Sequence, residues 1–107
     1  MTDHSLGKVV ARAKRGDRDA MGVLAQRAAA IGLRTAMVAL ADQHLARDVS
    51  QEVAIRVLRN LAALRSDDRF EAWAYRITVA ETRRAIASAR CTLARRLTPW
   101  SPMADAR

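Results

Sequence analysis

The stretch from Asp42 to Leu64 carries one row of apolar residues at three- and four-residue steps. An α-helix turns once in about 3.6 residues, so this spacing places the row on one side of a helix. Asp42 precedes the row, where a carboxylate can accept hydrogen bonds from the free N–H groups of a helix start. The segment therefore predicts a capped helix with a core side and a polar side. The core side comprises Ala46, Val49, Val53, Val57, Leu61 and Leu64.

The rest of the chain also favours helix. Gly and Pro number only 4 and 2 in 107 residues, and no window alternates apolar and polar residues as a half-buried strand does. We expect an all-α fold, a compact helical bundle of about four helices with a long C-terminal helix. The expected domain spans residues 1–97, and residues 98–107 are expected to form a linker or C-terminal tail.

Three further helices are predicted around the central one. A short helix carries Leu6 to Ala13 and stops at Gly16, and a second runs from about Arg18 to Ala41. We expect Gly32 to loosen or bend this second helix. The last helix begins near Phe70, after a polar break. The residues expected to face inward from the second helix are Met21, Leu24, Ala28, Ile31 and either Met37 or Val38.

Charge is distributed unevenly. Lys and Arg total 19 against 11 Asp and Glu, and only 3 of the 11 acidic residues follow residue 68, against 8 of the 19 basic ones. A cationic C-terminal half favours a polyanionic partner, because phosphate contacts release counterions. Simple solubility charge is the alternative.

Several classes of protein are disfavoured. Cys91 is alone, so it forms no internal disulfide, and His4 and His44 lack the spacing of metal ligands. No catalytic constellation or phosphate-binding glycine loop is present, so we expect no enzyme, cofactor or metal. We also expect no membrane-spanning run and no signal peptide, which makes the cytoplasm the default location.

The polar side of the central helix belongs to the run Asp48-Val49-Ser50-Gln51-Glu52-Val53, which follows Ala46-Arg47. This motif resembles region 2.2 of bacterial RNA polymerase sigma factors of the extracytoplasmic-function (ECF) group. The resemblance implies that this helix docks on the coiled coil of the polymerase β′ subunit. An ordinary solvated helix face is the alternative. The residues that we expect to bind polymerase are Asp48, Gln51, Glu52, Arg56 and Arg59.

Two more motifs follow the same family in order and spacing. The run Gly16-Asp17-Arg18-Asp19-Ala20-Met21-Gly22-Val23-Leu24 resembles the start of region 2.1, with Met21 where the family usually has Phe. The run from Phe70 to Ile77 resembles the start of regions 2.3 and 2.4 through Phe70, Trp73, Tyr75, Arg76 and Ile77. The three resemblances together cover about residues 8–90.

In that family, region 2 grips the −10 promoter element and captures an unstacked base of the non-template strand. Such a site needs a cationic track for phosphates and a pocket with stacking or hydrogen-bonding groups. The resemblance implies that the 65–69 loop forms the base pocket and that arginines of the last helix form the track. Phe70 and Ile77 are interpreted as core anchors. The expected DNA-binding residues are Arg65, Ser66, Asp67, Asp68, Arg69, Trp73, Arg76, Ala80, Arg83, Arg84 and Arg90.

The sequence also departs from the family. Ala54 replaces a usual Phe, Ala74 a Leu, Ala80 an Asn and Arg84 a frequent Asp or Asn. No region 4 follows, so the chain is either a truncated fragment or a stand-alone region 2 protein. The sequence therefore leaves three interpretations open: a helical protein unrelated to transcription, a sigma region 2 that recognises and melts the −10 element, or a sigma-like module that binds a regulatory protein. An anti-sigma factor or a separate region 4 protein would be that partner, and no membrane is expected.

Overall fold

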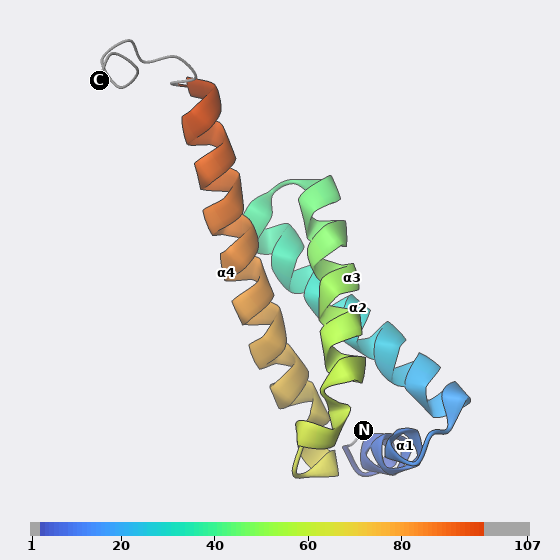
Figure 1. Cartoon of the computed structure of the whole chain (residues 1–107). Helices are drawn as coiled ribbons and strands as arrows, with labels where there is room; N and C mark the ends of the chain where they lie inside the picture. The colour runs from blue at the N-terminus through green and yellow to red at the C-terminus, as the bar shows by residue number, and fades with distance from the viewer. Residues whose placement is uncertain (1–2, 98–107) are drawn as a thin grey trace.

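The structure, a computed structural model, describes residues 3–97 and is built from four helices (Figure 1). These are α1 (Asp3–Lys14), α2 (Arg18–Leu40), α3 (Gln43–Arg59) and α4 (Phe70–Leu97). Two short 3₁₀ turns, η1 (Leu61–Ala63) and η2 (Asp67–Arg69), connect α3 to α4. No strand occurs within residues 3–97, so the all-α prediction is confirmed. The expected linker or tail at 98–107 lies outside the described residues.

Helix boundaries fall where the sequence places capping residues. The Asp17 carboxylate accepts from the Ala20 N–H at 3.2 Å and starts α2, after Gly16 has reversed the chain with a φ of 97°. The Asp42 carboxylate accepts from the N–H groups of His44 and Leu45 at 2.9 and 3.1 Å and starts α3. Both carboxylates satisfy donors that a helix start leaves unpaired. The predicted cap at Asp42 is confirmed.

All four helices contribute to the core, in which α2 and α3 run antiparallel and α4 packs along both (Figure 1). Every member of the row predicted from Ala46 to Leu64 is buried, which confirms the core side. The predicted helix is shorter than the row, because α3 ends at Arg59, and Leu61 and Leu64 reach the core from η1 and its C-cap. Helix α2 contributes small residues, and the Ser50 hydroxyl donates to the Ala29 carbonyl at 2.8 Å across the interface. Short side chains allow the two backbones to approach closely.

Gly32 belongs to this close approach. A Cβ on Gly32 would lie 3.2 Å from the Ser50 Cα and 3.3 Å from the side chain of Val53. The helix continues through Gly32 from Arg18 to Leu40. Gly32 therefore provides space for α3, which is a different role from the loosening or bending expected from the sequence.

The inward face of α2 was predicted correctly at its start and wrongly at its end. Leu24 and Ala28 are buried, and Met21 and Ile31 pack against the core, but Met37 and Val38 are 41% and 85% exposed. Ala36 is buried instead. The buried residues repeat every four positions, and each such step rotates about 40° further around a helix. By the end of α2 the buried stripe has therefore moved away from Met37 and Val38.

Helix α2 is also long and apolar enough to cross a membrane by length and composition alone. The expectation that no apolar run approaches this length was too strict. A core helix of a soluble protein passes the same test, and α2 places its buried stripe against α3. One such helix is weak support for a membrane span and does not make the chain a membrane protein.

Candidate polymerase and nucleic-acid interface

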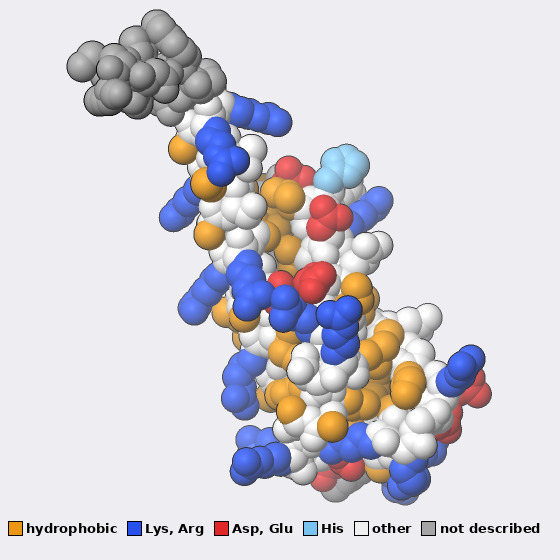
Figure 2. Space-filling view, viewed as in Figure 1, with side chains coloured by type: hydrophobic (Ala, Val, Ile, Leu, Met, Phe, Trp, Pro, Cys, Tyr) orange, Lys and Arg blue, Asp and Glu red, His pale blue; other side chains and the backbone are white. Residues whose placement is uncertain are grey.

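The side of α3 that runs from the α4 seam to solvent, beside the buried row, carries the five residues predicted to bind polymerase, here called the polar strip: Asp48, Gln51, Glu52, Arg56 and Arg59. Asp48, Gln51 and Arg59 are exposed, and Glu52 and Arg56 are partly buried where α3 meets α4. The acidic and amide residues are thus neither turned into the core nor scattered over separate faces. Figure 2 shows acidic side chains gathered over α3 and along its seam with α4.

An ion-pair network joins the polar strip to α4. The Arg56 Nε lies 3.2 Å from the Glu52 Oε2 on its own helix and 2.6 Å from the Glu81 Oε2 on α4. The Arg84 Nη1 lies 3.4 Å from the same Glu81 oxygen. The Glu81 side chain is only 8% exposed, so its charge depends on these two guanidinium groups.

Sequence reasoning did not single out Glu81. One signal was present, because Glu81 is the only acidic residue between Glu71 and Asp105 in an arginine-rich stretch. Its role became visible only once α3 and α4 were placed side by side. Glu81 and Arg84 also line two adjacent surface hollows, one on each side of the network.

The first of these, the strip-side hollow, has a volume of about 290 Å³ and includes Asp48 and Glu52. The second, the aromatic hollow, has a volume of about 320 Å³. It combines Trp73, Ala80 and Arg84, predicted to bind DNA, with Arg56, predicted to bind polymerase. Its other lining residues are Asn60, Ala63, Ile77 and Glu81.

The aromatic hollow has an indole suited to stacking on an unstacked base and an amide suited to a base edge, whereas its two guanidinium groups pair with Glu81. Asn60 was not predicted as a site residue. Its side-chain nitrogen donates to the Arg56 carbonyl at 2.8 Å at the end of α3, which leaves its amide oxygen free of that contact. Ile77 was predicted as a core anchor and is only partly buried, because one side of it faces this hollow.

The 65–69 loop, here called the reading loop, lies apart from the aromatic hollow, since none of its residues lines that hollow. Arg65, Ser66, Asp68 and Arg69 are exposed, whereas Asp67 is partly buried. The Asp67 Oδ1 lies 2.7 Å from the Lys14 Nζ of α1. The structure therefore turns the Asp67 carboxylate toward α1.

Three arginines predicted to form the phosphate track, Arg76, Arg83 and Arg90, are spaced at seven residues and exposed on α4. Seven residues are close to two helical turns, so the three side chains leave α4 on one side. The buried residues Phe70, Ala74 and Thr78 lie on the opposite side. Arg84 faces the aromatic hollow instead. Figure 2 shows Lys and Arg side chains along the outer side of α4.

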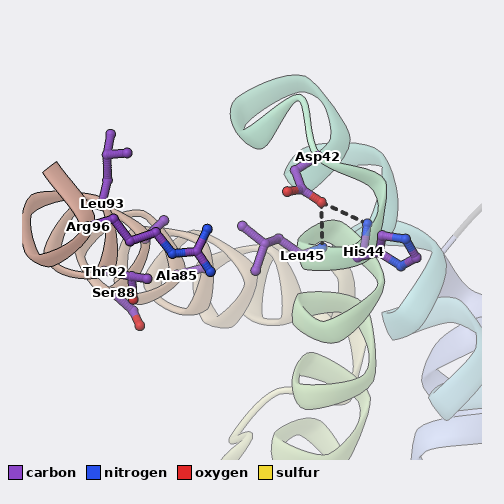
Figure 3. A pocket seen from close by; sticks show the side chains of 9 residues that line it. Asp42, His44, Leu45, Ala85, Ser88, Thr92, Leu93 and Arg96 are labelled. Carbon is purple, nitrogen blue, oxygen red and sulfur yellow. Dashed lines mark hydrogen bonds between the residues drawn. The ribbon is translucent and has the colours of Figure 1, made fainter.

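A third hollow, of about 470 Å³, lies between the start of α3 and the second half of α4 (Figure 3). Leu45 of α3 and Arg96 of α4 point toward one another across it. None of the residues predicted to bind polymerase or DNA lines this hollow. Within residues 3–97, no cluster of three or more His, Cys, Asp or Glu side chains offers a metal site.

Comparison with known families gives one match. Residues 25–92 match the family Sigma-70 region 2, which takes in most of α2, all of α3 and most of α4. No curated protein and no solved structure matches the chain significantly. The matched segment contains every residue of the polar strip, the reading loop and the α4 arginines predicted to bind DNA, whereas α1 and the end of α4 lie outside it. The chain therefore belongs to the sigma-70 region 2 family, whose members are non-enzymatic domains of transcription initiation factors that bind RNA polymerase and recognise promoters.

Proposed function

We propose that this chain is the region 2 domain of an ECF-group sigma factor, acting in the cytoplasm. The polar strip docks on the coiled coil of the polymerase β′ subunit, and α4 with the reading loop recognises and melts the −10 element. The observation that carries the proposal is that exposed Asp48 and Gln51 and partly buried Glu52 lie on one side of α3, next to a hollow that contains Trp73.

The polar strip of α3 and the outer side of α4 have different roles in this function. The polar strip offers carboxylates, an amide and guanidinium groups, which suit a charged protein surface. The outer side of α4 offers Arg76, Arg83 and Arg90 for the backbone of a separated DNA strand, and the aromatic hollow offers Trp73 for a flipped base. Polymerase supplies the bulk of the affinity, so a few base contacts of roughly 1–3 kcal/mol each suffice for selectivity.

Co-purification with core RNA polymerase tests the docking assignment. We expect Asp48→Ala with Gln51→Ala to abolish it while circular dichroism retains the helical signal. The matched control is Asp19→Ala with Gln26→Ala, which removes the same two residue types from exposed positions of α2. If the strip variant still co-purifies as the control does, the docking assignment is wrong.

A second candidate function is a sigma-like interaction module that binds an anti-sigma factor or a separate region 4 protein without melting DNA. The pairing of Arg84 with Glu81 favours it, because that pair diverts a cation from DNA. The aromatic hollow also has Ala80 in a position where the family usually has Asn. Run-off transcription with core polymerase separates the two functions. A transcript from a −10-dependent template supports the sigma factor, and tight protein binding without a transcript supports the module.

A further inference from the structure

We propose that Lys14 of α1 is a positioning residue for the reading loop and thereby sets its base selectivity. This inference rests on the proposed function, because it assumes that the reading loop meets promoter DNA. It concerns α1, which lies outside the segment that matches the sigma-70 region 2 family. Helix α1 crosses the end of the bundle where α3 turns into α4 (Figure 1).

The ammonium group of Lys14 contacts the chain on both sides of Arg65 and Ser66. The Lys14 Nζ donates to the Leu64 carbonyl at 2.6 Å and lies 2.7 Å from the Asp67 Oδ1. Arg65 and Ser66 are the two residues between these anchor points, and both are exposed. Fixing the residues on either side restricts the directions in which Arg65 and Ser66 project.

The contacts of Lys14 with Leu64 and Asp67, here called the clasp, are partly shielded from solvent. The side chains of Lys14 and Asp67 are 27% and 34% exposed, and the contact with the Leu64 carbonyl is partly buried. An ammonium group has three donors, so Lys14 can hold a carbonyl and a carboxylate at once. A neutral side chain of the same length would fill the space and hold neither.

Helix α1 also seats the second half of the reading loop. Gly7 is buried, and a Cβ added to it would overlap the Asp68 carboxylate and approach the Asp67 backbone. Leu6 and Val10 of α1 are buried in the core, so α1 is anchored to the bundle beneath the loop. The Arg69 N–H donates to the Ser66 carbonyl at 2.9 Å and closes η2 on this base. Two contacts from α1, at Lys14 and Gly7, thus fix both halves of the loop.

The test compares Lys14→Met with Lys8→Met in the full chain bound to core polymerase. Lys8 is exposed on the same helix, so both variants lose one positive charge and keep an unbranched side chain one atom shorter. Binding is measured to single-stranded −10-like DNA in which each position is changed in turn to the other bases. We expect Lys14→Met to lower the discrimination between preferred and other bases about fivefold, the low end of what one good base contact supplies. We expect Lys8→Met to leave discrimination unchanged.

Two further measurements test whether Lys14 acts through its contact with Asp67 and whether that contact keeps the reading loop closed. In an Asp67→Asn background, Lys14→Met should have a smaller effect on discrimination, because its carboxylate partner is already lost. In the free chain, hydrogen exchange at the Arg69 amide should speed up about tenfold in Lys14→Met and stay unchanged in Lys8→Met, since loss of the clasp lets the loop open locally.

The outcomes separate the two proposals. If the wild type discriminates among bases and Lys14→Met discriminates equally well, the positioning role is overturned and the proposed function stands. If the wild type binds polymerase but shows no base preference at any position, promoter reading by the loop is overturned, and the positioning role with it. Faster exchange at Arg69 in Lys8→Met as well would also overturn the clasp.

Discussion

The buried carboxylate of Glu81 gives the sharpest test of how α3 and α4 are joined. The substitution Glu81→Gln keeps the size of the side chain and removes its charge. Arg84 then loses its acidic partner and Arg56 keeps only Glu52, although the Arg56 Nε is itself buried from solvent. We therefore expect Glu81→Gln to lower the free energy of unfolding.

The magnitude follows from the exposure of each partner. Breaking a fully buried ion pair costs about 3–5 kcal/mol, and exposed pairs contribute about 0–1 kcal/mol. The Glu81 side chain is 8% exposed, but those of Arg56 and Arg84 are 38% and 64% exposed. Both guanidinium groups can turn toward water when the carboxylate is removed. The expected loss is therefore about 1–2 kcal/mol, between the two limits.

Urea unfolding followed by circular dichroism at 222 nm measures this loss. Glu71→Gln is the matched control, since Glu71 also joins α4 to another helix through an arginine. Its pair with Arg27 has an N–O distance of 3.1 Å, and the side chains of Arg27 and Glu71 are 52% and 44% exposed. We expect Glu71→Gln to change the stability by less than about 0.5 kcal/mol. Equal losses in the two variants, or a gain in Glu81→Gln, would refute the reasoning.

Three further predictions follow from other parts of the chain. A methyl group added at Gly22 meets open space, so Gly22→Ala should stabilise the fold by roughly 0.5–1 kcal/mol. Gly32→Ala in the same helix should destabilise the fold by about 1 kcal/mol, because the added methyl group overpacks against α3. Urea unfolding of the two variants measures both changes. Replacing Arg76, Arg83 and Arg90 by Gln should reduce the slope of log affinity for single-stranded DNA against log salt concentration by about 2. The control replaces Arg15, Arg18 and Arg47 by Gln and should reduce that slope less. Equal slopes in the two variants would contradict a phosphate track on α4. The pKa of Asp17 is lowered from 3.8, first by the N–H of Ala20 and then by Arg12. The stabilising charge of Asp17 is therefore fully present above pH 3.8 and is lost as the pH falls through the lowered pKa of the folded state. The difference in melting temperature between wild type and Asp17→Asn should therefore be larger at pH 6 than at pH 2.5, and a gap that widens in acid would contradict this sign.

Much of the fold was predictable because its signals are local. The row from Ala46 to Leu64 has a helical period, and Asp42 caps the helix within its own first turn. The error at Met37 and Val38 arose because periodicity alone does not show where along α2 the neighbouring helix crosses. The same limit applies to Gly32, whose role depends on the backbone of Ser50 on another helix.

The candidate site was predictable only in part, for the same physical reason. Trp73, Ala80 and Arg84 could be grouped because they share one helix, and the structure places them around one hollow. Lys14 contacts Leu64 from 50 positions away in the sequence. No local pattern encodes such a contact. Asn60 was missed likewise, because its place in the hollow depends on where α4 lies relative to the end of α3.

Site-specific photocrosslinking from the polar strip to core RNA polymerase tests the central claim most directly. A photoreactive residue at Gln51 should crosslink to the β′ subunit, and the same residue at exposed Gln26 of α2 should not. A crosslink to β′ from Gln26 with none from Gln51 would contradict the account.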